Sequence, residues 1–173
     1  MTRNGASDVP SSPRVLAMVL RVRHAGGVDE PVVQQGGAGN VIASAESFCV
    51  RLKVARAEIV MTEQRLAPRA EGPPLHFHRR HSDSFYVLSG RVAVRLDQEV
   101  VVVGQGGMIT VPPGVAHTFF NPDPAPSRFL NIHTPGVGFD RYLVEINAAL
   151  DAGADEEEIS RIQARYDSYM VES

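Results

Sequence analysis

The segment PPLHFHRRHSDSFYVLSG, residues 73–90, carries three of the six histidines of the chain and an aspartate within eight positions. His76 and His78 are two residues apart, so in a strand both side chains point to the same face, with Cα atoms roughly 6 to 7 Å apart. Two imidazoles placed in this way can bind one divalent ion of the first transition row, and a nearby carboxylate adds charge and an oxygen ligand. Asp83 could be that carboxylate, because a strand would turn it inward with Phe85, where an unpaired charge is costly. We therefore predict a metal site in this segment.

A second segment, GGMITVPPGVAHTFFN (residues 106–121), supplies another candidate ligand, His117. Pro112, Pro113 and Gly114 are typical of a tight turn, which would direct the following strand back across the core. Only a closed β-structure brings His117 beside the first two histidines. The metal prediction and the prediction of a barrel therefore support each other.

The elements that must position these residues are mostly short strands. Between residues 14 and 134, β-rich runs of about five to seven residues alternate with Gly, Pro, Asn and Asp, which is typical of a sandwich or barrel. Helical spacing then appears in the apolar residues Phe139, Tyr142, Leu143, Ile146 and Leu150. A second helix is predicted after Asp155, a suitable N-cap, with one apolar face formed by Ile159, Ile162, Tyr166 and Tyr169.

We accordingly divide the chain into four parts. These are a flexible tail (1–13), N-terminal β segments that include EPVVQQ (14–39), a β-barrel (40–135) and two C-terminal helices (136–173). At 173 residues and 43% hydrophobic composition, the chain is sufficient for one domain with a core of its own.

The bulk composition excludes several classes of partner. The net charge of −3 and the pI near 6.1 provide no basic field for phosphate backbones, so we expect no nucleic-acid partner. The apolar run Val15–Leu20 is too short for a signal-peptide core or a membrane span, so we expect no membrane association. A single cysteine, Cys49, cannot form an internal disulfide, and we expect a cytoplasmic protein.

The two segments together resemble the signature motifs of the cupins. The first cupin motif, G-x5-H-x-H-x3-4-E-x6-G, is matched at its two histidines and at Gly90, with Asp83 in place of the usual glutamate and Ala70 in place of the leading glycine. The second, G-x5-P-x-G-x2-H-x3-N, is matched at every fixed position, by Gly106, Pro112, Gly114, His117 and Asn121.

This resemblance implies an all-β fold, a double-stranded β-helix of the jelly-roll kind, with a metal inside. The implied ligands are His76, His78, Asp83 and His117, and the implied cofactor is one divalent ion among Fe, Mn, Ni, Co, Cu and Zn. Cupins of this size are commonly dimers, so a homodimer is expected. Asp83 is one methylene shorter than glutamate, which leaves open whether it binds the metal directly, through water, or by orienting a histidine.

In motif order and size the chain looks similar to quercetinase-like cupins. This resemblance implies a metal-dependent dioxygenase acting on a small aromatic or flavonol-like substrate, with Asp83 as ligand and as catalytic base. Two alternatives stay open: a non-redox isomerase, cyclase or decarboxylase that uses the ion as a Lewis acid, and a binding protein without turnover. The histidines could also line a pocket that has lost its metal.

Other residues near the motifs receive more ordinary assignments. Phe85 and Phe119 should fill the core and, if a cavity remains above the metal, form an apolar wall for the substrate. His81 is predicted to be an exposed loop residue, with a substitute ligand or proton shuttle as the alternative. His133 is assigned a structural role, with the pocket mouth as the alternative, and Arg79–Arg80 a solvated loop rather than an anion site.

Overall fold

The structure of the protein is a computed structural model that describes residues 31–171. The predicted tail (1–13) and most of the predicted N-terminal β segments (14–30) lie outside the described residues. Residues 31–39 form turns and irregular structure, so the strand expected at EPVVQQ is absent from its described part. The regular structure begins with β1 at Asn40.

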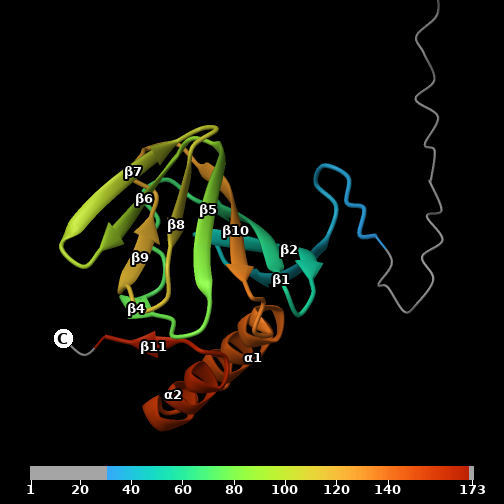
Figure 1. Ribbon diagram of the computed structural model, residues 1–173, viewed down its shortest axis with the longest axis vertical. Helices are drawn as coiled ribbons and strands as arrows, with labels where there is room; N and C mark the ends of the chain where they lie inside the picture. Colours follow the sequence, from blue (N-terminus) through green and yellow to red (C-terminus); the bar gives the residue numbers. More distant parts are fainter. Residues whose placement is uncertain (1–30, 172–173) are drawn as a thin grey trace, which may run out of the picture. The chain divides into compact units, whose positions relative to one another are not determined.

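Eleven strands in the described chain form two antiparallel sheets (Figure 1). The first, in the order β1-β2-β3-β10-β5-β8, consists of β1 (Asn40–Ser44), β2 (Phe48–Ala55), β3 (Val60–Leu66), β10 (Ser127–Thr134), β5 (Ser82–Ser89) and β8 (Met108–Val111). The second, in the order β11-β4-β9-β6-β7, consists of β11 (Tyr169–Met170), β4 (His76–Phe77), β9 (His117–Phe120), β6 (Arg91–Leu96) and β7 (Glu99–Gly104).

The chain passes repeatedly from one sheet to the other, so strands distant in sequence become neighbours. β10 lies between β3 and β5, and β9 lies between β4 and β6. This topology is that of the jelly-roll double-stranded β-helix, and the predicted all-β fold class is confirmed.

The core between the sheets explains the alternating sequence pattern of the strands. Phe85 of β5, Phe119 of β9 and Phe129 of β10 meet with ring centroids 5.2 to 5.9 Å apart. Aromatic side chains bury large apolar areas, so this trio stabilises the core cluster to which it belongs.

Two motif glycines have conformations that favour glycine. Gly90, between β5 and β6, has φ 72°, and a Cβ there would lie 3.0 Å from the carbonyl oxygen of Pro126. Gly114 has φ 84°, and its backbone N–H donates to the carbonyl of His78 at 2.6 Å. The turn of the second motif is therefore bonded directly to the histidine segment of the first.

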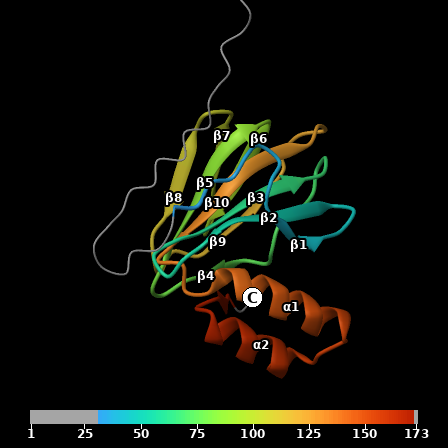
Figure 2. The ribbon, with the colours of Figure 1, turned by 90° about the vertical axis from the view of Figure 1, so that its right-hand side faces the viewer.

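Two helices follow the strands, as predicted. α1 (Phe139–Asp151) and α2 (Glu156–Arg165) lie together at the end of the sheets where β4 and β11 are found (Figures 1 and 2). The Asp155 side chain accepts a hydrogen bond from the backbone N–H of Glu158 at 2.8 Å, which confirms the predicted N-cap. The helices pack on the barrel through an apolar cluster of Val60, Phe139, Tyr142, Ile146 and Ile162.

The predicted helical face of α2 is wrong at its last residue. The helix ends at Arg165, Asp167 takes a left-handed conformation with φ 63°, and Tyr169 belongs to strand β11. β11 pairs with β4, Met170 facing His76, so the C-terminal segment extends the sheet that carries the histidines. This long-range pairing overrides the local helical spacing, and no periodicity could have predicted it.

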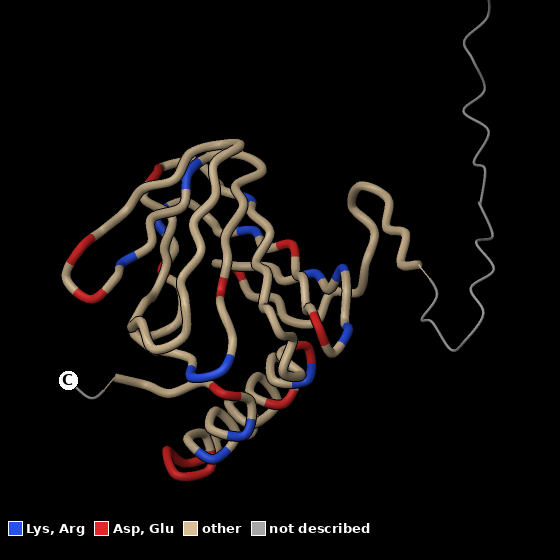
Figure 3. The backbone as a smooth tube through the Cα atoms, viewed as in Figure 1, with Lys and Arg blue, Asp and Glu red and all other residues tan. Residues whose placement is uncertain are grey.

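Charges are distributed along the described chain rather than gathered in one region. Figure 3 shows basic and acidic segments interspersed over loops, strands and helices. Within residues 31–171, no helix has the length and hydrophobicity needed to cross a bilayer.

Candidate metal centre

Antiparallel pairing brings the histidines of the two motifs together. His76 of β4 lies opposite His117 of β9, and their ring centroids are 4.6 Å apart. His78 follows β4 directly, with its ring centroid 5.0 Å from that of His76 and 5.3 Å from that of His117. The structure therefore brings together the three histidines predicted as ligands.

Asp83 approaches this group from the other sheet. It lies near the start of β5 and is 2% exposed, and its Oδ2 is 3.4 Å from Nε2 of His117. One potential ligand atom from each of His76, His78, Asp83 and His117 lies within 4.8 Å of the others, and all four side chains are buried. We call these residues the four-residue cluster.

Hydrogen bonds to the backbone orient each of the three imidazoles. Each Nδ1 lies 2.8 to 3.0 Å from a carbonyl oxygen, that of Pro74 for His76, of Asp167 for His78 and of Val115 for His117. A carbonyl only accepts, so each Nδ1 carries the proton and each Nε2 presents a lone pair. Partners of this kind hold histidines in the tautomer and orientation that bind a metal.

The ligand atoms of the four-residue cluster are better satisfied by a divalent transition metal than by one another. In that tautomer, Nε2 of His117 and the nearby Oδ2 of Asp83 are both acceptors, so their approach is unfavourable without a cation between them. Nε2 of His78 is buried and has no hydrogen-bond partner. Three imidazole nitrogens and one carboxylate oxygen are ligands for Zn²⁺, Mn²⁺, Fe²⁺ and their neighbours in the series.

The pKa values of His76, His78 and Asp83 favour the metal-binding protonation states at neutral pH. Burial, together with the neighbouring histidines, lowers the pKa of His76 to about 4 and that of His78 to about 3. For Asp83, burial alone would raise the pKa, but His133 and His117 outweigh it and the pKa is lowered. Neutral imidazoles and a charged carboxylate are the protonation states that coordinate a metal.

A network of side-chain amides holds Asp83. The Nδ2 group of Asn131 donates to Oδ1 of Asp83, and Nε2 of Gln64 donates to Oδ1 of Asn131 at 3.0 Å. Asn131 and Gln64 are buried on the paired strands β10 and β3, where the register places Asn131 opposite Thr62 and diagonal to Gln64. The sequence prediction missed both residues, and their only signal was a polar side chain at an inward position of a strand.

The prediction for His81 is wrong. Its side chain is buried rather than exposed, and its Nδ1 lies 2.8 Å from Oδ2 of Asp167. Asp167 also accepts from the backbone N–H groups of Arg79 and Arg80 at 3.2 and 2.8 Å. The C-terminal segment therefore holds the whole loop inward, a contact across more than 80 positions that local sequence could not reveal.

The assignment of Arg79 and Arg80 to a solvated loop agrees with the structure. The side chains of Arg79 and Arg80 are exposed, with Arg79 packed 4.1 Å from the ring centre of Tyr169. His133 is buried and stacks on Phe139 at a centroid distance of 3.5 Å, while its Nε2 lies 2.9 Å from Oδ1 of Asn131.

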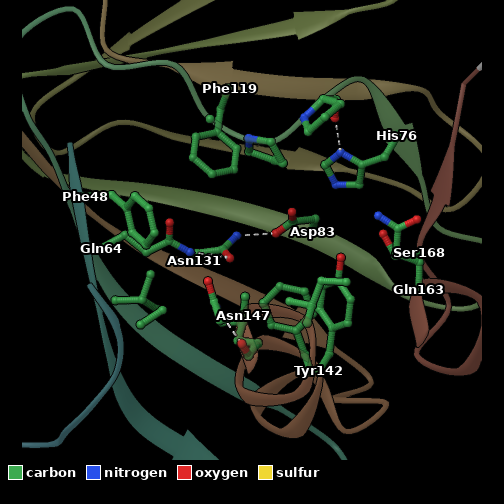
Figure 4. Close-up of a pocket in the computed structure, with 18 of the residues that line it drawn as sticks. Phe48, Gln64, His76, Asp83, Phe119, Asn131, Tyr142, Asn147, Gln163 and Ser168 are labelled. Atoms are coloured by element: carbon green, nitrogen blue, oxygen red, sulfur yellow. Dashed lines mark hydrogen bonds between the residues drawn. The ribbon is translucent and has the colours of Figure 1, made fainter. Parts of the chain in front are cut away.

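A cavity of about 350 Å³ lies between the barrel and the C-terminal helices (Figure 4). His76 and Asp83 line it, so the four-residue cluster has one side open to a ligand. Figure 4 shows these two residues facing Tyr142 and Asn147 of α1 across the cavity. A space of this size suits a small organic molecule.

The predicted substrate wall is found only in part. Phe119 lines the cavity, whereas Phe85 does not and is fully buried in the aromatic trio. The two positions share the barrel interior, but Phe85 lies deeper. Much of the apolar wall comes instead from β2 and α1, which provide Phe48, Phe139, Leu143 and Ile146.

Residues 62–133 match the sequence model of a family described as Cupin domain, a range that contains the whole four-residue cluster. No curated protein sequence matches the chain significantly. The match and the topology together support the cupin superfamily, and the fold is the cupin double-stranded β-helix.

Several solved structures share this fold. An RmlC-like cupin from Shewanella frigidimarina is 22% identical with a TM-score of 0.54, over 62% of this chain and 93% of that one. KdgF from Halomonas sp. is 19% identical with a TM-score of 0.50, over 56% and 86%. A Klebsiella pneumoniae protein with a double-stranded β-helix domain is 23% identical with a TM-score of 0.50, over 56% and 84%. At these identities the likeness concerns the fold alone.

Proposed function

We propose that the protein is a metal-dependent enzyme that binds one divalent transition-metal ion in the four-residue cluster and acts on a small organic molecule in the adjoining cavity. The observation that carries this proposal is the position of His76 and Asp83, which belong to the cluster and also line the cavity. A substrate there would lie directly beside the bound ion.

For the reaction we propose dioxygenation of a small aromatic or flavonol-like substrate. Four protein ligands leave one or two positions open on a five- or six-coordinate ion, and a redox-capable ion there would polarise a substrate hydroxyl and activate dioxygen. Both oxygen atoms of O₂ would enter the product. Phe48, Phe119 and Phe139 offer flat apolar surfaces to an aromatic substrate.

Asp83 suits the role of ligand better than that of catalytic base. Its lowered pKa makes the carboxylate a weak proton acceptor at neutral pH. Asn131, which donates to Oδ1, stabilises the charged form and fixes its orientation. In our proposal Asp83 supplies negative charge and an oxygen ligand to the ion.

The polar part of the cavity wall favours a second candidate, non-redox Lewis-acid chemistry on a hydroxylated substrate. Four carboxamide side chains reach the cavity from two strands and two helices, namely Gln64 (β3), Asn131 (β10), Asn147 (α1) and Gln163 (α2). Amides donate and accept hydrogen bonds without carrying charge, which suits neutral hydroxyl and carbonyl groups. An isomerase, cyclase or decarboxylase would use such contacts.

The test separates these reactions. Protein stripped of metal is reloaded singly with Fe²⁺, Mn²⁺, Co²⁺, Ni²⁺, Cu²⁺ or Zn²⁺ and mixed anaerobically with a flavonol, whose absorption should change on binding. Oxygen is then admitted and its uptake is measured against His78→Ala as the control without metal. Uptake that requires both metal and substrate supports the dioxygenase, and binding without uptake contradicts it and favours the Lewis-acid enzyme or a binding protein.

A further inference from the structure

A second group of histidines shares His78 with the four-residue cluster, and its other two members have no part in the proposed reaction. It consists of His78, His81 and His133, which we call the three-histidine cluster. Each side chain is 1 to 2% exposed, and one ring nitrogen from each lies within 4.8 Å of the others. His81 lies in the loop before β5 and His133 lies in β10, so their convergence is a product of the tertiary fold.

Each of these rings is fixed through one nitrogen. Nδ1 of His78 bonds to the carbonyl of Asp167 at 2.8 Å, and Nδ1 of His81 bonds to its carboxylate at 2.8 Å. Nε2 of His133 bonds to Oδ1 of Asn131 at 2.9 Å. All three partners are oxygen acceptors, so the bonded nitrogens carry the protons.

The remaining nitrogens therefore present lone pairs, and they have no partner. Nε2 of His78, Nε2 of His81 and Nδ1 of His133 are buried without a hydrogen bond. Buried polar atoms are rarely left unsatisfied, because a buried group without a partner bears the full cost of losing its hydrogen bonds to water. A single water could donate to only two of the three, whereas a cation would satisfy all of them.

We propose that the three-histidine cluster is a second metal position, an alternative to the four-residue cluster because both require Nε2 of His78. That nitrogen has one lone pair and its Nδ1 is engaged with Asp167, so His78 can bind only one ion at a time. The chain then holds one ion, at either of two neighbouring positions.

The two positions differ in chemistry. The three-histidine cluster offers nitrogen alone, which suits Zn²⁺ and disfavours Mn²⁺, an ion that prefers oxygen ligands. The carboxylate of Asp167 accepts a hydrogen bond from Nδ1 of His81. A carboxylate in this position orients an imidazole and raises its basicity as a metal ligand. The four-residue cluster includes the carboxylate of Asp83 and accommodates the harder ions.

The two positions also differ in access. His76 and Asp83 line the cavity, whereas His78, His81 and His133 do not, and Phe139 covers the ring of His133. An ion in the three-histidine cluster is therefore closed off from a substrate. We call the three-histidine cluster the closed position and the four-residue cluster the open position. Zinc bound at the closed position would withdraw His78 from the open position and leave the enzyme inactive.

Two double variants test the proposal by titration with Zn²⁺ and with Mn²⁺. In His76→Gln/His117→Gln the open position is removed, and we expect Zn²⁺ affinity to change by less than about tenfold while Mn²⁺ affinity falls by more than about 100-fold. In His81→Gln/His133→Gln the closed position is removed, and Mn²⁺ affinity should stay within about tenfold of the wild type. Circular dichroism verifies that both variants are folded.

The control adds His78→Gln to the first variant and should abolish its zinc binding. If folded His76→Gln/His117→Gln binds Zn²⁺ no better than this triple variant, the closed position does not exist. Mn²⁺ binding by His81→Gln/His133→Gln would still support the proposed active site in that case. Anomalous diffraction from wild-type crystals gives an answer that needs no variant. A zinc peak among His78, His81 and His133 supports the proposal, and a zinc peak that coincides with the manganese peak beside Asp83 overturns it.

Discussion

Asp83 is the candidate ligand that differs from the usual cupin glutamate, and its surroundings explain how a shorter carboxylate is kept in place. Asn131 donates to one carboxylate oxygen, and the other lies 3.4 Å from Nε2 of His117. The bond from Asn131 fixes the carboxylate, although the side chain has one methylene less than glutamate, and the second oxygen faces the acceptor nitrogen of His117 across the position proposed for the metal. The metal would therefore find a positioned carboxylate, and the histidines would supply most of the affinity.

Substitutions at Asp83 and His78 should accordingly have unequal effects. We expect Asp83→Ala to weaken metal binding roughly 10- to 100-fold, and His78→Ala to abolish it because both metal positions lose a nitrogen. Asp83→Glu should hold or raise the affinity, since it restores the usual reach. Calorimetric titration with Mn²⁺ measures all three, and equal losses for Asp83→Ala and His78→Ala would show that the aspartate is as essential as the histidines.

Asp167 should influence the metal without touching it. Its backbone carbonyl orients His78 and its carboxylate orients His81, so Asp167→Ala should lower zinc affinity roughly 10- to 100-fold. Asp155→Ala is a matched control at the N-cap of α2, which should cost about 1 kcal/mol of stability and leave metal binding unchanged. If the two variants bind zinc equally well, Asp167 has no positioning role.

At the scale of elements, α1 and α2 form one wall of the cavity and should control substrate binding independently of the metal. Leu143 of α1 lines the cavity, whereas its neighbour Val144 does not line it and is 53% exposed. Leu143→Trp should fill part of the cavity and weaken flavonol binding at least tenfold, with metal binding intact. Val144→Trp should leave both unchanged, and equal flavonol affinities for the two variants would show that the substrate binds elsewhere.

The elements also show what the sequence could predict. Alternation and turn residues were enough to predict the strands of the barrel, and the spacing from Phe139 onward predicted α1, because these signals are local. β11 and the burial of His81 depend on contacts between residues 76–81 and 167–170. Neither segment alone has a sequence pattern that indicates these contacts. The candidate ligands could be predicted because motif spacing on paired strands fixes their convergence, whereas the amide network around Asn131 required the register of β3 and β10.

For the molecule as a whole, the buried histidines predict a pH-dependent stability. Burial lowers the pKa of His76 and His133 to about 4 and that of His78 to about 3, whereas in the unfolded chain these groups titrate near 6.5. Between these values the unfolded chain binds more protons than the folded one, so acid favours unfolding. The pKa of Asp83 is also lowered, so its contribution is lost only at still lower pH.

The metal-free protein should therefore lose stability as the pH falls from about 6.5 toward 4, on the order of 1 kcal/mol per buried histidine per pH unit. Urea unfolding at about pH 7.5, 6 and 5 measures this loss. His133→Gln should reduce the slope, because it removes one of the titrating groups. A free energy of unfolding that is constant over this range would contradict the burial of neutral histidines.

The central claim is that the histidines and Asp83 bind a divalent metal, and elemental analysis of the purified protein tests it most directly. Protein produced without added metal and passed through gel filtration should contain close to one transition-metal ion per chain, and His78→Ala purified in parallel should contain almost none. Removing the ion with a chelator should lower the melting temperature of the wild type, because an ion that binds only the folded state stabilises it by mass action. A wild-type protein that carries no transition metal, and whose melting does not respond to added Mn²⁺, Fe²⁺, Co²⁺, Ni²⁺, Cu²⁺ or Zn²⁺, would contradict the claim.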